Sequence, residues 1–117
     1  MVRARIPILC LCSLAVHGCA LPGNEASFDS IDPTARSHAA LEAAKRDDRR
    51  SIPALITMLG SSDPALRLIA AETLERLTGR TFGYEASAPV GEREDAVERW
   101  VRWWESSGGG ARGGELD

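Results

Sequence analysis

Apolar residues recur every three or four positions over most of residues 32–105, which is the spacing of amphipathic α-helices. The clearest example has apolar side chains at positions i, i+3, i+4 and i+7: Ile52, Leu55, Ile56 and Leu59. These four side chains share one face of a helix. The pattern predicts four helices, at about 33–45, 51–60, 64–79 and 92–105, and therefore an all-α fold.

Residues that favour helix ends stand at these boundaries. Asp32-Pro33 and Asp63-Pro64 each place an N-cap carboxylate before a proline that suits the first helical position. Gly60 and Gly79 are expected to end the second and third helices, because glycine readily adopts the left-handed conformation found there. The mixed charges of residues 45–50 predict a solvated turn.

The predicted third helix has an apolar stripe that leaves one leucine outside it. The stripe consists of Leu66, Ile69, Ala70, Thr73, Leu74 and Leu77. Arg67, Glu72 and Glu75 lie outside the stripe, and Leu68 lies nearly opposite its centre. We therefore expect Leu68 to be exposed or to contact something beyond the intramolecular core.

The first and fourth helices differ in the size of their predicted contact faces. The first presents small side chains that allow close approach of a second helix, with one leucine among them: Ser37, Ala40, Leu41 and Ala44. The fourth presents a large face flanked by Trp103: Val97, Trp100, Val101 and Trp104. Ahead of the first helix, Phe28 and Ile31 are the residues expected to dock on the helices.

Four helices make a short stack, and a short stack needs a cap over its end. Gly83 predicts a tight bend that returns its neighbours Phe82 and Tyr84 to the helices. Together with the indoles of the fourth helix they are expected to form the cap, since a large aromatic side chain can bury about 150 to 250 Å². The alternative is that an indole binds a partner, and Trp103 is then the one expected to be partly exposed.

The first residues have the layout of a secretory signal. Arg3 and Arg5 precede an apolar run that ends near Val16. The run is too short for a permanent transmembrane helix, which needs about 20 residues.

The run continues into Val16-His17-Gly18-Cys19, which resembles the lipobox of bacterial lipoproteins. The resemblance implies cleavage before Cys19 and a thioether between its sulfur and a glyceride that carries fatty acyl chains such as palmitate. Cys10 and Cys12 would leave with the signal, so the mature chain would have no free thiol. The alternatives are an ordinary signal peptide cut nearby, perhaps after Ala20, or an uncleaved buried helix.

This interpretation divides the chain into four parts. They are a signal peptide at 1–18, a lipidated cysteine with its linker at 19–31, a helical domain at 32–105 and a disordered glycine-rich tail at 106–117.

A family resemblance runs through the helical part. Residues 51–77 resemble a HEAT repeat, with proline near the start of the first helix, a short turn, and then Asp63-Pro64-Ala65-Leu66-Arg67 followed by Ala70 and Leu74. The resemblance implies an armadillo-type fold, a short α-α superhelix of about two helical hairpins. It also implies a structural role for Arg67 between repeats, beside the alternative that Arg67 anchors an acidic partner.

Charge and residue chemistry narrow the functional classes. Loss of residues 1–18 lowers the formal charge from −3 to −5, which leaves no basic stripe for a nucleic acid. His38 is the only histidine of the mature chain, and it has no nucleophile or carboxylate at a telling spacing. We therefore expect no catalysis, no cofactor and no metal.

These observations favour a small protein-interaction module anchored by lipid on the periplasmic side of a membrane. Its partner would be an unknown envelope protein, and the candidate contacts are Leu68, Arg67 and Trp103. Ala20 after the lipidated cysteine points to an outer membrane if one is present. The alternatives are an accessory, lyase-like enzyme that uses His38, and a purely structural envelope component that associates with itself.

Overall fold

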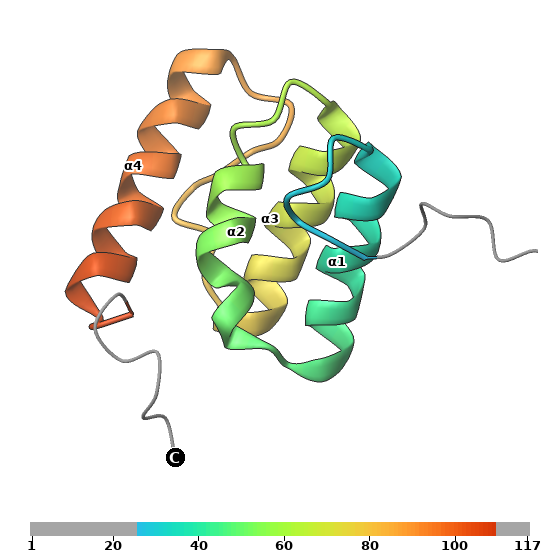
Figure 1. Ribbon diagram of the computed structural model, residues 1–117. Coiled ribbons are helices and arrows are strands. Elements are labelled where there is room, and N and C mark those ends of the chain that lie inside the picture. The colour runs from blue at the N-terminus through green and yellow to red at the C-terminus, as the bar shows by residue number, and fades with distance from the viewer. Residues whose placement is uncertain (1–25, 110–117) are drawn as a thin grey trace, which may run out of the picture.

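The computed structural model describes residues 26–109, and this part of the chain is built from four α-helices (Figure 1). The helices are α1 (Pro33–Arg46), α2 (Ile52–Met58), α3 (Pro64–Thr78) and α4 (Val90–Ser106), with a 3-10 turn, η1 (Arg49–Ser51), ahead of α2. The predicted all-α fold is confirmed. Helix α4 begins about two residues earlier than predicted, and it includes Ser106, the first residue of the predicted tail.

The predicted end signals act as expected at both ends of α3 and at the start of α1. The Asp32 carboxylate accepts a hydrogen bond from the Thr34 N–H at 2.9 Å, and the Asp63 carboxylate accepts one from the Ala65 N–H at 2.8 Å. Gly79 ends α3 with φ of 71°, a conformation that disfavours side chains with a Cβ. Helix α2 differs: it ends at Met58 with Leu59 as a right-handed C-cap, and Gly60 does not have a positive φ, so its predicted left-handed helix end is wrong.

The helices lie in two layers that alternate along the sequence. Helix α1 packs beside α3 in one layer, and α2 packs beside α4 in the other. The turn at 59–63 folds α2 and α3 onto each other as a hairpin that joins the layers. The α2–α3 hairpin is thus one complete helical repeat, with half a repeat, α1 and α4, on each side of it (Figure 1).

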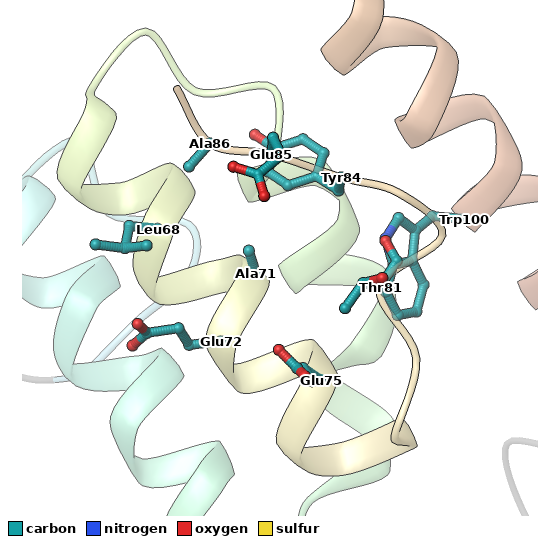
Figure 2. A pocket seen from close by; sticks show the side chains of 9 residues that line it. All are labelled: Leu68, Ala71, Glu72, Glu75, Thr81, Tyr84, Glu85, Ala86 and Trp100. Atoms are coloured by element: carbon teal, nitrogen blue, oxygen red, sulfur yellow. The ribbon is translucent and has the colours of Figure 1, made fainter. Parts of the chain in front are cut away.

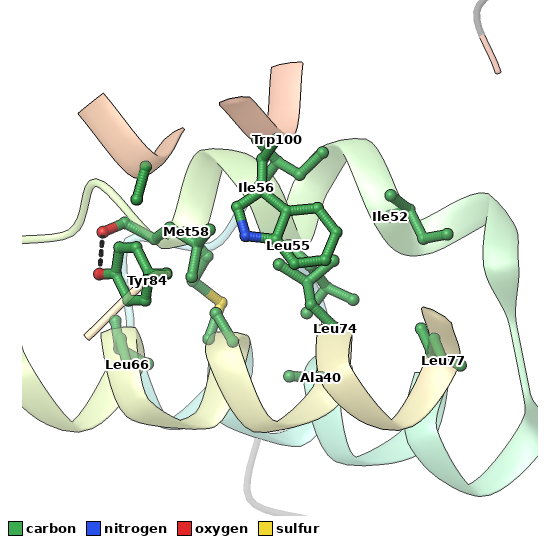
Figure 3. Close-up of a cluster of buried hydrophobic side chains, with 13 residues drawn as sticks. Ala40, Ile52, Leu55, Ile56, Met58, Leu66, Leu74, Leu77, Tyr84 and Trp100 are labelled. Atoms are coloured by element: carbon green, nitrogen blue, oxygen red, sulfur yellow. Dashed lines mark hydrogen bonds between the residues drawn. The ribbon is translucent and has the colours of Figure 1, made fainter. Parts of the chain in front are cut away.

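The core lies between the layers and is made of aliphatic side chains closed by one indole (Figure 3). Trp100 of α4 is 1% exposed and covers the leucines of the hairpin. The most deeply buried large side chains are Ile52, Leu55, Leu59, Leu66, Leu74 and Trp100. The predicted stripe of α3 is buried except for Ile69, which is only partly covered.

Three apolar residues that were expected to pack are exposed instead: Ile31, Leu41 and Val101. Helix α1 meets α3 through an alanine face, Ala35, Ala39, Ala40 and Ala43, and Leu41 lies on the side that no described helix covers. Val101 likewise lies on the outer side of α4. Phe28 packs against the core as expected, whereas Ile31 beside the N-cap is 97% exposed, so its predicted docking is wrong.

Replacing one buried and one exposed leucine separates the packing contribution from helix propensity. Leu74→Ala should lower the free energy of unfolding by about 2 to 5 kcal/mol, because Leu74 is fully buried and its removal leaves a cavity. Leu41→Ala, which makes the same change in a helix where the side chain is 47% exposed, should cost less than about 1 kcal/mol. Urea denaturation followed by circular dichroism measures both, and equal losses would contradict this assignment of the core.

Candidate functional site

The segment between α3 and α4, residues 79–89, determines the shape of the surface beside α3. It runs back along the hairpin to the start of α4 (Figure 1). The Tyr84 hydroxyl donates a hydrogen bond to the Leu59 carbonyl oxygen at 2.7 Å, and the Tyr84 side chain is only 7% exposed (Figure 3). The predicted return of Tyr84 to the helices is confirmed, and Gly83 has the positive φ of the predicted bend.

Arg67 holds the same segment from the side of α3. Its Nε donates to the Ala86 carbonyl oxygen at 3.1 Å, and its Nη1 donates to the carbonyl oxygens of Ser61 at 3.0 Å and Ser62 at 3.1 Å. Arg67 thus lies outside the apolar stripe, as predicted, yet it is 9% exposed because this segment covers it. This geometry agrees with the structural role that the HEAT resemblance implies, and it leaves little of the guanidinium accessible to a partner.

An aromatic cluster joins residues 79–89 to α4. The Trp100 indole N–H donates to the Thr81 carbonyl oxygen at 3.1 Å, and the Phe82 and Trp100 rings meet edge to face with centroids 4.7 Å apart. Trp103 lies 5.6 Å from Trp100 and 5.8 Å from Phe82, measured between ring centroids. Trp103 is therefore partly buried within the aromatic cap, and only part of its surface is available for a contact.

A large hollow lies at the end of the molecule where the charged turn faces the last turn of α4. Its volume is about 750 Å³, and its walls are Arg46, Asp47, Asp48, Arg49, Arg50, Pro53, Trp103, Trp104, Ser107, Gly108 and Gly109. The charges lining it have both signs. Residues 45–50 were predicted to form a solvated turn, but the Arg49 side chain in it holds the end of α3 by donating a hydrogen bond to the Leu77 carbonyl oxygen at 2.9 Å.

A smaller groove of about 150 Å³ lies between α3 and the segment 79–89, and we define it here as the α3 groove. Its lining residues are Leu68, Ala71, Glu72, Glu75, Thr81, Tyr84, Glu85, Ala86 and Trp100. Figure 2 shows Glu72 and Glu75 on the α3 side and Glu85 on the opposite side, with Ala71 between them. Leu68, which is 50% exposed, stands at one end of the groove, so the predicted exposure of this leucine is confirmed.

The α3 groove is acidic. It is lined by three carboxylates and no basic side chain. In the part of the chain that the structure describes, the ion pairs involve a different carboxylate, Glu42, which contacts Lys45 and Arg46 and has its pKa lowered mainly by Lys45. Two arginines close to the segment, Arg67 and Arg93, direct their Nε atoms to backbone carbonyl oxygens. The groove carboxylates are thus left without an ion-pair partner among residues 26–109.

The remaining predictions from the sequence concern His38, metal binding and Cys19. His38 lies half-buried on α1 and does not line the α3 groove. The expectation that it has no catalytic role stays a prediction. Within residues 26–109 no group of three or more His, Cys, Asp and Glu side chains is placed to hold a metal ion. None of the described helices is both long and apolar enough to cross a membrane. Cys19, the predicted lipidation site, lies outside the described residues.

Sequence reasoning identified Leu68 but did not identify the groove beside it. Helical periodicity placed Glu72 and Glu75 away from the apolar stripe, which is where they lie. Glu85 belongs to an irregular segment, so no periodicity relates it to α3. Only the hydrogen bonds of Tyr84 and Arg67 bring Glu85 to the groove.

Tyr84 gives a direct test of how residues 79–89 are attached, because it is the only tyrosine of the chain. Burial raises its pKa above the ordinary value of 10.0, although Arg93 partly opposes the change. Ultraviolet titration should therefore give a tyrosinate midpoint above pH 10 in the folded protein and a lower midpoint in urea.

The same shift makes stability depend on pH. The stabilisation is fully present below pH 10, where both states keep the proton, and is lost as the pH rises from 10 through the folded-state pKa. Tyr84→Phe should remove this dependence and, because it leaves the Leu59 carbonyl oxygen unpaired, lower the free energy of unfolding by about 1 to 2 kcal/mol. A tyrosine that titrates identically in the folded and unfolded states would contradict the buried attachment.

The comparisons with known proteins agree with this geometry. A family model described as HEAT repeats matches residues 25–105, which is more than half of the chain. No curated protein and no solved structure matches it. The matched residues include the α2–α3 hairpin, the buried Arg67 and the capping helix α4. The chain therefore belongs to the HEAT repeat family.

Proposed function

We propose that this chain is a protein-interaction module held at a bacterial envelope membrane by a lipid on Cys19. HEAT repeats generally mediate contacts between proteins, which supports a protein partner in general. The observation that carries the proposal is the position of Leu68, which is half exposed at the end of an open groove on α3. An exposed leucine beside an open groove offers a partner an apolar contact and a concave surface in one place.

The rigidity of this surface supports the same function. The α3 groove is bordered on one side by a helix. On the other side lies a segment held by the hydrogen bonds from Tyr84 to the Leu59 carbonyl oxygen and from Arg67 to the Ala86 carbonyl oxygen. A preformed surface loses little conformational entropy when a partner binds. Trp103, the other candidate contact, is engaged in the aromatic cluster, so we place the main contact at Leu68.

The membrane anchor is proposed from the sequence. Arg3 and Arg5, the short apolar run and Val16-His17-Gly18-Cys19 together support export and acylation. Each buried methylene contributes about 0.8 kcal/mol to membrane binding, so two or more acyl chains hold a protein stably. The proposal places the folded part on the periplasmic side, joined to the anchor by the residues after Cys19. We propose no catalytic activity for it.

A photoreactive amino acid tests the interaction surface. Placed at Leu68, it should form a discrete crosslinked adduct in intact cells that express the full-length chain, because this position is exposed beside the groove. Placed at Leu41, which is similarly exposed but lies on α1, it should give at least about tenfold less of that adduct if contacts concentrate at one site. Adducts of equal yield at both positions, or none at Leu68, would argue against a specific interaction surface on α3.

The lipid anchor has its own test. Cys19→Ala should abolish incorporation of a radioactive or alkyne-labelled fatty acid and release the protein from washed membranes, because the thiol is the proposed site of the thioether to the acylated glyceride. The double variant Cys10→Ser/Cys12→Ser is the matched control and should keep the label, since both residues lie in the proposed signal. Label retained by the Cys19→Ala protein would refute acylation at this position.

A further inference from the structure

The layered arrangement leaves one position beside α3 without a helix in the described part of the chain. Helix α1 covers α3 on one side within its layer, and α4 extends the other layer beyond α2. A complete next repeat would place its second helix beside α3, on the side away from α1. The segment 79–89 occupies part of that position, and the α3 groove is the part that stays open (Figure 2).

The size and lining of the groove indicate what kind of side chain fits. A volume of about 150 Å³ holds one ring-sized or long side chain. Ala71, Tyr84 and Trp100 supply apolar surface, and Glu72, Glu75 and Glu85 place carboxylates on two sides of it. Lysine and arginine combine an apolar stem with a cationic head, so both parts of the lining are matched by one such side chain.

Resting on the proposed function, we propose that the α3 groove binds a basic amphipathic helix of a partner protein in the position of the missing repeat helix. Apolar side chains of this helix pack on Leu68 and Ala71. A lysine or arginine one turn away enters between the carboxylates of the groove, as the i, i+3 and i+4 spacing of a helix allows.

Charge complementarity favours a basic helix over an acidic one as the occupant of the α3 groove. The groove has three carboxylates and no cation in its lining, and these carboxylates have no ion-pair partner among the described residues. An acidic helix would be repelled there, whereas a basic one would pair with the three exposed carboxylates. The larger hollow at the end of the molecule is lined by both charge signs and selects neither.

The test uses two synthetic peptides and the full-length chain with Cys19→Ser, which removes the proposed lipidation site. One peptide is a model amphipathic helix of leucine and lysine, and the other has glutamate at every lysine position. Fluorescence anisotropy should show saturable binding of the lysine peptide and none of the glutamate peptide. Of the three indole N–H signals in the NMR spectrum, that of Trp100 should shift and that of Trp104 should not, because only Trp100 lines the groove.

Charge reversals distinguish the groove from general attraction to an acidic protein. Glu72→Lys/Glu75→Lys should weaken binding of the lysine peptide by at least about tenfold, because it places cations where the peptide's cation binds. Glu94→Lys/Glu98→Lys changes the net charge equally on the exposed side of α4 and should weaken it by less than about threefold. Circular dichroism of both variants checks that they stay helical.

Three results would overturn the basic-helix proposal. They are equal weakening by both double variants, tighter binding of the glutamate peptide, and concentration-dependent self-association that Glu72→Lys/Glu75→Lys abolishes, which would make a second copy the occupant. Failure of peptide binding together with a specific adduct at Leu68 would refute only the basic occupant. Failure of both experiments would refute the interaction surface itself.

Discussion

The structure depends on the way residues 79–89 are tied to the α2–α3 hairpin. Arg67 satisfies three backbone carbonyl oxygens, two in the turn before α3 and one at Ala86, and the Tyr84 hydroxyl satisfies a fourth at the end of α2. Buried carbonyl groups need such partners because an unpaired one costs about 1 to 3 kcal/mol. These contacts set the path of the segment. The path in turn sets where α4 begins and which part of α3 stays open.

The aromatic cap compensates for the small number of repeats. A HEAT hairpin buries its apolar faces against neighbouring repeats, and residues 26–109 supply half a repeat on each side of the hairpin. On the α1 side, small alanines allow close packing of one helix on another. On the α4 side, Trp100 closes the core, and Phe82 and Trp103 each meet its ring edge to face while lying tilted against each other. Bulky rings at one end and close helix packing at the other each help to cover the apolar faces of the hairpin where neighbouring repeats are few.

The proposed function follows from what this compact arrangement leaves uncovered. The acidic α3 groove lies where a longer stack would continue, so the surface that ordinarily joins repeats is free to join a second protein. The proposed lipid on Cys19 would add effective concentration, because a partner in the same membrane meets the groove in two dimensions. A modest contact area beside Leu68 would then suffice for association at the membrane surface.

Periodicity and capping residues were enough to predict the four helices and most of the core, because both are local properties of the chain, whereas the end of α2 and the start of α4 were predicted less accurately. Asp32, Asp63 and Gly79 mark helix ends, and the stripe from Leu66 to Leu77 marks the buried face of α3. Periodicity does not predict burial where burial depends on which helices pack nearby. Leu41 and Val101 fit a helical stripe, yet each is exposed on a side that no described helix covers. Only the tertiary structure buried Arg67 and brought Glu85 opposite Glu72 and Glu75, since hydrogen bonds between residues distant in sequence place the irregular segment 79–89.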